Sequence, residues 1–384
     1  MGTTIPYARQ WVDEEDIAAV VAALKSDYLT QGPEVERFEE SLRKATGARY
    51  CVAVSSASAG LMMAVAALGI EEEQEGITSP NTFVASASCL VQNGMRPRFV
   101  DIDQKSLCID PEKVETFVNK RTRVVVPVHF AGQPADMERI KKVADRNDLR
   151  IVEDAAHAIG SYYNDGTPVG SCTFSDCCVF SFHAVKTVTT GEGGAITTND
   201  SALYQRLIRL RSHGITRDPQ LLEKVPGPWY YEMTGLGSNY RLTDIQAALG
   251  VCQLQKLELF RARRQEIFQR YQDAFTGIPC ITCPTVPNWK KVCLHLYVLQ
   301  FDFESMGQTR QEFMSRLSSE GVGTQVHYIP VHLQPYFRDR FGTQPGDCPV
   351  AEAYYEKALS LPFFPKLTDA EVERVIQTVQ TACP

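Results

Sequence analysis

The chain has 384 residues, and its shares of apolar (44%) and charged (22%) residues are those of a globular enzyme, which excludes disordered and fibrous proteins. Its net charge of −7, without clustered basic residues, argues against nucleic acid as a main partner. Because no apolar run reaches the roughly 20 residues of a membrane helix and the start lacks a signal-peptide pattern, we expect a cytoplasmic protein with no membrane partner.

Two helices are predicted at the start of the chain, over residues 13–25 and 35–45. Short β-branched runs follow, with helical stretches between most of them. These predicted strands cover residues 50–54, 98–102, 124–128, 150–153, 178–181 and 195–198. The alternation predicts an α/β fold with a mostly parallel central sheet, and ligands of such sheets bind beyond the carboxyl ends of the strands.

The second half of the chain has a different character. Residues 212–238 are rich in glycine, proline and aromatic residues and predict a long loop, which in compact enzymes is usually functional or part of an interface. A strong helix is predicted over 243–264, and strands near 296–301 and 323–327 indicate a smaller C-terminal α+β domain. We therefore expect a large domain over residues 1–254 and a small one over 255–384.

The twelve cysteines are scattered, several of them inside apparent strands, and are interpreted as small buried residues of a reducing compartment. Cys280 and Cys283 have the spacing of a metal or redox pair. No second pair lies nearby and no helix start follows, so a chance pair is favoured. The histidines show no paired ligand spacing, and no metal is expected.

Lys186 is the most informative residue of the sequence. It follows the predicted strand at 178–181 and precedes the glycines of residues 191–194, in a segment rich in hydroxyl groups. Such a segment suits a cofactor that carries an aldehyde and a phosphate. Burial beside an apolar strand lowers the pKa of a lysine and makes its neutral amine available as a nucleophile. The alternative is an ordinary surface lysine.

An acidic residue, Asp154, ends the strand predicted at 150–153, and His157 follows within one turn. A carboxylate here can keep the ring nitrogen of pyridoxal phosphate protonated, and the imidazole can hydrogen-bond the phenolic oxygen of that cofactor. The alternatives are a helix cap for Asp154 and a purely structural role for His157.

The small residues 55–60 lie between a predicted strand and an apolar helix. Their free backbone N–H groups and the positive helix end predict a phosphate site at Ala57 and Ser58. The alternative is an ordinary helix N-cap by Ser56 or Ser58. Phe83 is a candidate for stacking on the cofactor ring, with core packing as the alternative.

Just before the helix predicted at 243–264, Asn239 offers an amide and Arg241 a guanidinium. Both groups can reach a phosphate or a carboxylate. The alternative is helix capping by Asn239 or Thr243.

Taken in this order, the residues resemble the DegT/DnrJ/EryC1/StrS family of sugar-nucleotide aminotransferases, which have the aspartate-aminotransferase fold (fold type I). The resemblance covers nearly the whole chain. It includes residues 26–33, 99–103, 127–132, 211–214, 326–330 and 360–362. The dehydratase members of this family replace the lysine by histidine, so Lys186 favours transamination. Ala57-Ser58 followed by Gly60 departs from the Gly-Thr-Ala-Ala of many members, although the hydroxyl survives in Ser58.

The resemblance implies that the protein is a homodimer that binds pyridoxal 5′-phosphate, with its active site at the subunit interface. Lys186 would bond to the cofactor aldehyde, and Asp154 would pair with the ring nitrogen. The remaining roles implied are His157 near the phenolic oxygen, Ser181, Ala57 and Ser58 at the phosphate, Asn239 reaching it from the second subunit, and His327, Tyr328 and Arg241 at the substrate.

Within the family, residues 153–158, 181–186 and 294–297 are most similar to members that aminate C4 of a UDP-linked 4-keto-6-deoxy-N-acetylhexosamine in pseudaminic acid biosynthesis. Those members take nitrogen from L-glutamate and make a product of the UDP-4-amino-4,6-dideoxy-N-acetyl-altrosamine type. The alternatives are another nucleotide-linked keto sugar as substrate, or a non-catalytic regulatory protein of the same fold. Lys186 and Asp154, both intact, count against the regulatory protein.

Overall fold

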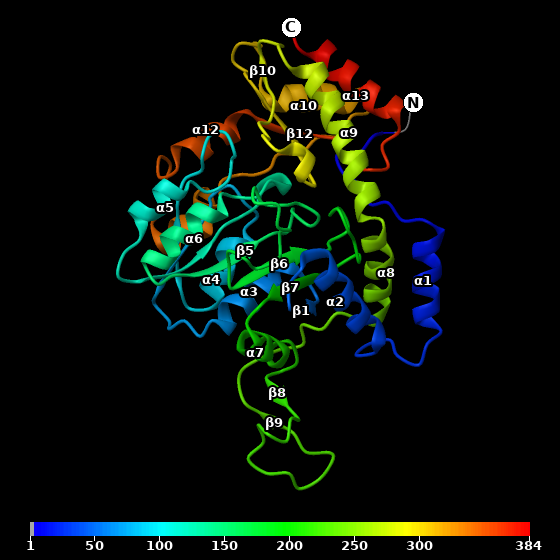
Figure 1. Ribbon diagram of the computed structural model, residues 1–384. Coiled ribbons are helices and arrows are strands. Elements are labelled where there is room, and N and C mark those ends of the chain that lie inside the picture. Colours follow the sequence, from blue (N-terminus) through cyan, green and yellow to red (C-terminus); the bar gives the residue numbers. More distant parts are fainter. Residues whose placement is uncertain (1–3) are drawn as a thin grey trace.

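The computed structural model describes residues 4–384, which form a central seven-stranded sheet and a second sheet at the end of the molecule that carries both termini (Figure 1). The order in the central sheet is β1-β7-β6-β5-β4-β2-β3. Its strands are β1 Tyr50–Val54, β2 Glu75–Thr78, β3 Arg96–Phe99, β4 Thr122–Val126, β5 Arg150–Asp154, β6 Cys177–Ser181 and β7 Gly194–Thr198. Strand β7 runs antiparallel to both its neighbours, and the pairs from β6 to β3 are parallel. The predicted α/β class is confirmed.

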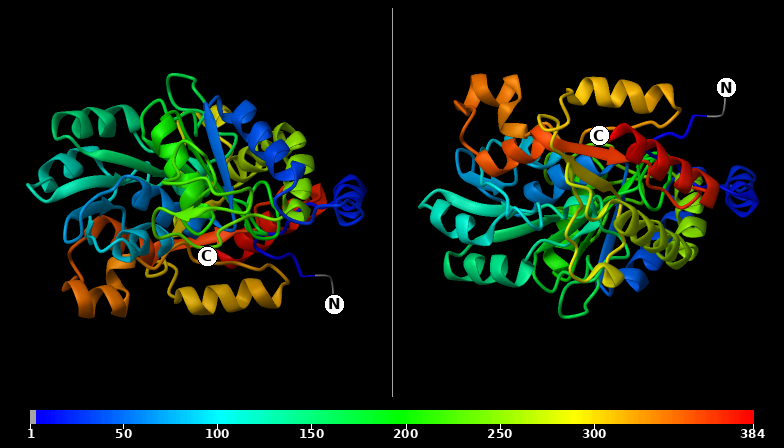
Figure 2. Two further views of the ribbon diagram at one scale, coloured as in Figure 1. Left: turned by 90° about the horizontal axis from the view of Figure 1, so that it is seen from below. Right: turned by 90° about the horizontal axis from the view of Figure 1, so that it is seen from above.

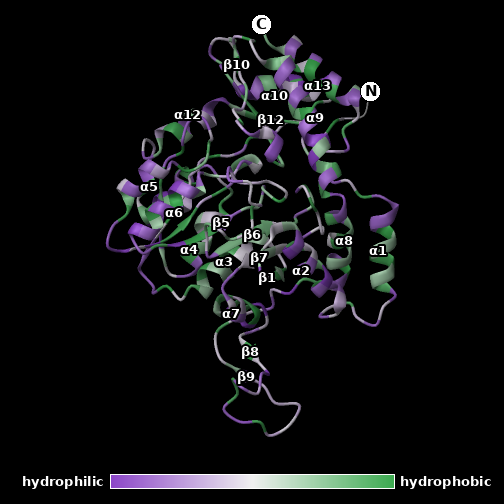
Figure 3. Ribbon diagram, in the orientation of Figure 1, coloured by the Kyte–Doolittle hydropathy of each residue, from purple (hydrophilic) through white to green (hydrophobic). Residues whose placement is uncertain are grey.

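Helices cover both faces of the central sheet (Figure 2) because successive strand residues point to opposite sides. The helices around the sheet are α1 Glu14–Leu24, α2 Pro33–Thr46, α3 Ala57–Ala67, α4 Ala85–Gln92, α5 Pro111–Phe117, α6 Met137–Arg146, α7 Ser201–Arg211 and α8 Asp244–Gln255. In β6, Val179 packs in the core beneath α3 and α7, whereas Cys178 and Phe180 pack in the core beneath α2, α6 and α8. Figure 3 shows the hydrophobic residues gathered in these strands and hydrophilic ones along α5 and α6.

The second sheet is antiparallel, in the order β10-β11-β12. Its strands are β10 Ile281–Thr282, β11 Tyr297–Phe301 and β12 Ala358–Leu361, and the helices of this half are α9 Leu257–Phe275, α10 Arg310–Ser319, α11 Pro335–Phe341, α12 Pro349–Lys357 and α13 Asp369–Ala382. Helices α9, α10 and α13 pack with this sheet around a separate apolar core, whereas α11 and α12 contribute Phe337 and Tyr354 to the core of the central sheet. Three short 3-10 turns lie at Phe130–Gly132, Trp289–Lys291 and Val331–Leu333. The predicted boundary between residues 254 and 255 falls at the end of α8 and stays a prediction.

The helix predicted over 243–264 is two helices, α8 and α9, which meet at Lys256. The ammonium of Lys256 donates to Asp13 Oδ1 at 2.6 Å and to Asp16 Oδ2 at 2.8 Å. These contacts tie the junction to α1. Sequence periodicity does not report such a long-range tie, and this explains the error.

Two strand predictions need correction. Residues 323–327 form no strand, only a single bridge between Gln325 and Ser360. Conversely, β2 was missed because it is four residues long and contains Gly76. A Cβ atom at Gly76 would lie 2.4 Å from Leu90 Cδ2, so the glycine leaves room for the side chain of Leu90 to pack closely against the strand.

The long loop predicted at 212–238 is confirmed, with one short hairpin inside it. Strands β8 (Ile215–Thr216) and β9 (Glu232–Met233) pair at its base, and the loop projects from the body of the molecule (Figure 1). Several of its large apolar residues face solvent, including Trp229 at 70% and Leu236 at 85% exposure. We call this segment, residues 214–236, the arm.

The cysteines are free thiols, and all but Cys283 and Cys383 are buried, as the sequence predicts. Across residues 4–384, no helix is both long enough and apolar enough to cross a lipid bilayer.

Candidate active site

A cavity of about 420 Å³ lies at the carboxyl ends of the parallel strands, where such sheets bind ligands. The structure brings most of the predicted site residues together around it. These are Ala57, Ser58, Phe83, Asp154, His157, Ser181, Lys186, His327 and Tyr328. The cavity is also lined by residues to which the sequence analysis gave no role, among them Tyr7 and His295.

Lys186 sits in a turn closed by its own backbone. The N–H of Phe182 donates to Gly193 O at 2.9 Å, and the N–H of Thr190 donates back to Phe182 O at the same distance. Gly191 has a φ of +78°, a conformation that favours glycine. The hydroxyl-rich and glycine-rich sequence thus fixes the place from which the lysine enters the cavity.

The turn of Lys186 lies against the start of α3. A Cβ atom at Gly194 would come within 2.5 Å of the carbonyl carbon of Ser56 and 2.6 Å of Ala57 N. Backbone atoms cannot give way as a flexible side chain can, so residue 194 must lack a side chain. Glycine at this position therefore joins the lysine turn to the predicted phosphate site.

Burial lowers the pKa of the Lys186 amine to about 8, and the nearby charge of Asp154 opposes part of this effect. A substantial fraction of the amine is therefore neutral slightly above neutral pH. The alternative of an ordinary surface lysine is wrong.

Asp154 is the last residue of β5 and is buried at the floor of the cavity. Its Oδ2 accepts a hydrogen bond from Ser86 Oγ at 2.6 Å, and its Oδ1 accepts one from the N–H of Ala156 at 3.1 Å. No helix begins after Asp154 in this part of the described chain, so the helix-cap alternative is wrong. The carboxylate is held in place and faces the cavity that Lys186 enters.

His157 contacts Tyr328, with 3.2 Å between the imidazole Nε2 and the phenol oxygen. Its buried Nδ1 has no partner among the described residues. Burial lowers the pKa of His157 well below its usual value, and the charges of Lys186 and His327 add to the effect. The ring is therefore neutral and has hydrogen-bonding capacity left over, which a purely structural histidine would have used.

The imidazole of His295 lies 4.6 Å from that of His157, centroid to centroid, and its Nδ1 is also without a partner. Residues 294–297 carry part of the family resemblance, but the sequence alone indicates no role for His295. Burial and then the charge of Lys186 lower the pKa of His295 well below its ordinary value. The sequence could not show that His295 lies beside His157, since the two are 138 positions apart (295 − 157).

The start of α3 combines both interpretations of residues 55–60. Ser56 is the N-cap, because its Oγ accepts from the N–H of Ala59 at 3.2 Å. Ala57 and Ser58 then line the cavity with the first turn of the helix. The predicted Ser181, at the end of β6, lines the same cavity. Small side chains and free N–H groups at a helix N-terminus suit a phosphate.

Phe83 is 59% exposed and lines the cavity, so the core-packing alternative is wrong. Opposite it, the ring of Tyr328 lies 6.5 Å away. His327 is held by Ser360, with 2.7 Å between Nδ1 and Oγ, and burial followed by the charge of Lys186 lowers its pKa to about 4. These three rings form an aromatic wall around the cavity.

Asn239 and Arg241 do not line the cavity of their own chain. Asn239 is exposed, and its Oδ1 accepts from the N–H of Arg241 at 3.3 Å. Thr243 is the N-cap of α8, so the capping alternative holds for Thr243 and is wrong for Asn239. The role of Asn239 in a second subunit stays a prediction.

The residues of the cavity fit pyridoxal phosphate. A lysine of lowered pKa, a fixed carboxylate and an exposed aromatic ring surround the space, and a helix N-terminus adjoins it. The unpartnered Nδ1 of His157 supplies a hydrogen-bonding group that nothing else in the described chain satisfies.

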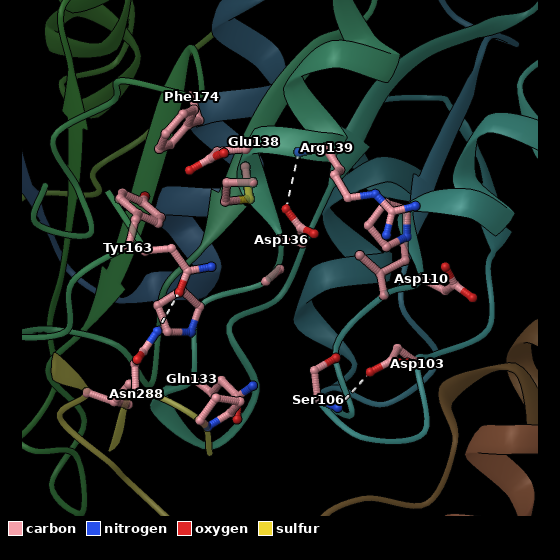
Figure 4. A pocket seen from close by; sticks show the side chains of 18 of the residues that line it. Asp103, Ser106, Asp110, Gln133, Asp136, Glu138, Arg139, Tyr163, Phe174 and Asn288 are labelled. Carbon is pink, nitrogen blue, oxygen red and sulfur yellow. Dashed lines mark hydrogen bonds between the residues drawn. The ribbon is translucent and has the colours of Figure 1, made fainter. Parts of the chain in front are cut away.

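A second cavity, of about 380 Å³, lies apart from Lys186 between α5, α6 and the loop of Asn288 (Figure 4). Carboxylates such as those of Asp110 and Glu138 line it, together with Arg139. Tyr163 forms part of its wall and connects it to the floor of the central sheet, as described below.

The fold is that of an aminotransferase. The chain belongs to the DegT/DnrJ/EryC1/StrS aminotransferase family, whose sequence pattern matches residues 10–380. The family resemblance, the fold class and the enzyme class predicted from the sequence are thereby confirmed. The chain is 42% identical to the spore coat polysaccharide biosynthesis protein SpsC of Bacillus subtilis over 377 residues, which make up 98% of this chain and 96% of SpsC.

Two solved structures are similar over almost the whole chain. The first is PseC of Helicobacter pylori, an aminotransferase involved in the biosynthesis of pseudaminic acid, with 31% identity, a TM-score of 0.92 and 99% of each chain covered. The second is a putative sugar aminotransferase of Streptococcus pneumoniae, Spr1654, whose PLP form has 30% identity and a TM-score of 0.89, covering 99% of this chain and 98% of that one. Spr1654 has also been solved in a PMP form.

Proposed function

We propose that this protein is a pyridoxal-phosphate-dependent aminotransferase that transfers the amino group of L-glutamate to a nucleotide-linked 4-keto-6-deoxy sugar. The observation that carries the proposal is the meeting of Lys186, with its pKa lowered to about 8, and the buried Asp154 in one cavity. The PLP and PMP forms of Spr1654 support this cofactor, since they are the two forms that a transaminase alternates between.

The predicted site residues have proposed places toward the cofactor. Lys186 would bond to its aldehyde, Asp154 to its ring nitrogen and His157 to its phenolic oxygen, while Phe83 would stack on its ring. Ala57, Ser58 and Ser181 would hold its phosphate, with Asn239 added by the second subunit. When bound, the cofactor supplies the electron sink that allows an amino group to leave one carbon and join another.

The chain's own residues supply the proton chemistry. The amine of Lys186, partly neutral near pH 8, would move a proton between the Cα of the amino donor and C4′ of the cofactor, and in the reverse direction when the sugar is aminated. Asp154, fixed by Ser86 and Ala156, would direct its carboxylate at the ring nitrogen. His327 and Tyr328 line the substrate side of the cavity, and Arg241 is a further candidate from the second subunit.

The specific substrate that we propose is a UDP-linked 4-keto-6-deoxy-N-acetylhexosamine, aminated to a product of the UDP-4-amino-4,6-dideoxy-N-acetyl-altrosamine type. The likeness to PseC supports it. A second candidate is another nucleotide keto sugar, which the higher identity to SpsC, a protein of spore coat polysaccharide biosynthesis, favours. The shape of the cavity rim decides between the two.

We further propose a cytoplasmic homodimer whose active sites lie at the subunit interface. The exposed apolar residues of the arm, such as Trp229 and Leu236, supply surface for a second copy to cover. Asn239 lies outside its own cavity, which is consistent with service in the cavity of a partner.

The test is to incubate purified protein with pyridoxal phosphate, glutamate and a panel of UDP- and dTDP-4-keto-6-deoxy sugars. The cofactor is followed by absorbance and the sugar product by mass. We expect glutamate to convert the cofactor to its amine form and the UDP-N-acetyl keto sugar to reverse the change. Reversal by a different sugar would select the second candidate, and a cofactor that glutamate leaves unchanged would refute transamination with this donor.

A further inference from the structure

A second carboxylate, that of Glu153, precedes Asp154 in β5. Successive residues of a strand point to opposite faces of the sheet, so Glu153 lies beneath the floor of the active-site cavity while Asp154 faces into it. Glu153 is 0% exposed. A carboxylate in such a position is costly unless donors surround it, and its retention calls for an explanation.

Three uncharged groups donate to the carboxylate of Glu153. Its Oε2 accepts from Tyr163 OH at 2.6 Å and from His129 Nε2 at 2.8 Å, and its Oε1 accepts from Ser175 Oγ. His129 Nδ1 accepts the N–H of Ala135 at 3.1 Å, so the ring proton lies on Nε2 and the ring is neutral. These contacts therefore stabilise the negative charge of Glu153 without cancelling it.

The backbone of Asp154 is held by hydrogen bonds to two residues of the neighbouring chain segment, one of which is His129. The N–H of His129 donates to Asp154 O at 3.1 Å, and the N–H of Asp154 donates to Pro127 O at 2.9 Å. His129 is thus bonded to Glu153 through its ring and to Asp154 through its backbone. The position of Asp154 therefore depends on Glu153 through the two hydrogen bonds that His129 makes.

The charge of Glu153 acts on its surroundings. Burial raises the pKa of Tyr163 well above its usual value, and Glu153 raises it further. Burial and then Glu153 do the same to the thiol of Cys178 in β6. The negative charge of Glu153 thus favours the protonated forms of Tyr163 and Cys178. The same charge also favours a proton on a group bound to the adjacent Asp154.

We propose that Glu153 is a positioning residue for Asp154. Glu153 fixes the place of Asp154 through His129, and its buried charge strengthens the interaction of Asp154 with a protonated cofactor ring nitrogen. The proposal rests on the proposed function, since it concerns the same cofactor. Tyr163 belongs to the same hydrogen-bonded group as Glu153 and His129, and it also forms part of the wall of the second cavity (Figure 4).

The test compares Glu153→Gln with Glu75→Gln. Glu75 is a matched control because it is also 0% exposed and fully hydrogen-bonded, but lies at the amino end of β2. The variants are loaded with pyridoxal phosphate labelled with ¹⁵N in the ring. The ¹⁵N shift and its pH titration report protonation of the ring nitrogen, and thermal unfolding of the apo-proteins reports stability.

We expect Glu153→Gln to move the ¹⁵N signal toward the neutral ring and to lower kcat about 10-fold, as loss of a hydrogen-bond partner that supports a metal ligand does at metal sites, with KM for glutamate unchanged. Glu75→Gln should lower the unfolding temperature and leave the signal at the wild-type position. A Glu153→Gln protein that is less stable but has the wild-type ¹⁵N titration would overturn the proposal.

Tyr163→Phe allows the proposal to be tested if Glu153→Gln fails to fold. It removes one of the three donors to the buried carboxylate of Glu153, so the ¹⁵N signal should move in the same direction by a smaller amount. An unchanged signal in Tyr163→Phe would count against the proposal. A wild-type protein that does not bind the cofactor would refute the proposed function itself, whereas a normal wild type with silent variants would refute only the role of Glu153.

Discussion

The two ends of the central sheet both bury acidic residues, but they treat the charge differently. At the amino end, Glu75 is paired with Arg98 at 3.1 Å and with Arg121 at 2.7 Å. At the carboxyl end, Asp154 and Glu153 have hydroxyl, amide and imidazole donors instead of arginines. An acid neutralised by arginine serves the fold, whereas an acid whose charge is kept can act on a bound group.

The contrast between the two ends of the sheet is tested most directly by Lys186→Ala at the carboxyl end. We expect turnover to fall below detection, since proton transfer by a positioned side chain alone contributes on the order of 10²–10⁴-fold. The cofactor should still bind through its phosphate contacts. Product mass and cofactor absorbance measure both effects, with the exposed Lys105→Ala as control. Normal turnover by Lys186→Ala would sink the assignment of the site.

Asp154→Asn comes next, because it keeps the shape of the side chain and removes only its charge. We expect kcat to fall by roughly 10²-fold, within the range for groups that act on proton transfer. The apo-protein should keep its unfolding temperature within a few degrees, since Ser86 can still donate to the amide oxygen. A variant with wild-type kcat would mean that the charge of Asp154 is not used.

The pairing at the amino end predicts the opposite result for Glu75→Gln. Stability should fall by about 1–3 kcal/mol, because Arg98, Arg121 and Asn119 lose their charged acceptor. Turnover should be unaffected. Burial raises the pKa of Glu75, but Asn119 and the two arginines outweigh it and lower the pKa. The stability that Glu75 contributes is therefore present above its ordinary pKa and lost on acidification below it.

A subtler prediction concerns pH. Capture of the cofactor aldehyde by the apo-protein requires the neutral amine of Lys186, so its rate should rise with a midpoint near pH 8. Between about pH 8 and the ordinary lysine pKa of about 10.5, the unfolded chain binds the proton that the folded protein has released, so stability relative to Lys186→Met should rise with pH. In Asp154→Asn the midpoint should move down, because the charge of Asp154 raises the pKa of Lys186. Stopped-flow absorbance and denaturant titrations measure these effects.

The sequence predicted best what is encoded in short stretches. The strand at Tyr50–Val54 was predicted with its observed bounds. Lys186 and Asp154, predicted to lie close together because Asp154 ends one buried strand and Lys186 follows another, line the same cavity. It failed where long-range packing decides, as at Lys256, which α1 holds at the junction of two helices. His295 escaped assignment for the same reason, since only the folded chain brings it against His157.

The contact of Gly194 with Ser56 and Ala57 makes one rigid joint of the lysine turn and the start of α3. Neither part can be altered without displacing the other. A side chain added at residue 194 would therefore push apart two segments that line the same cavity, so a change at a single residue would disturb the wall at both Lys186 and Ala57.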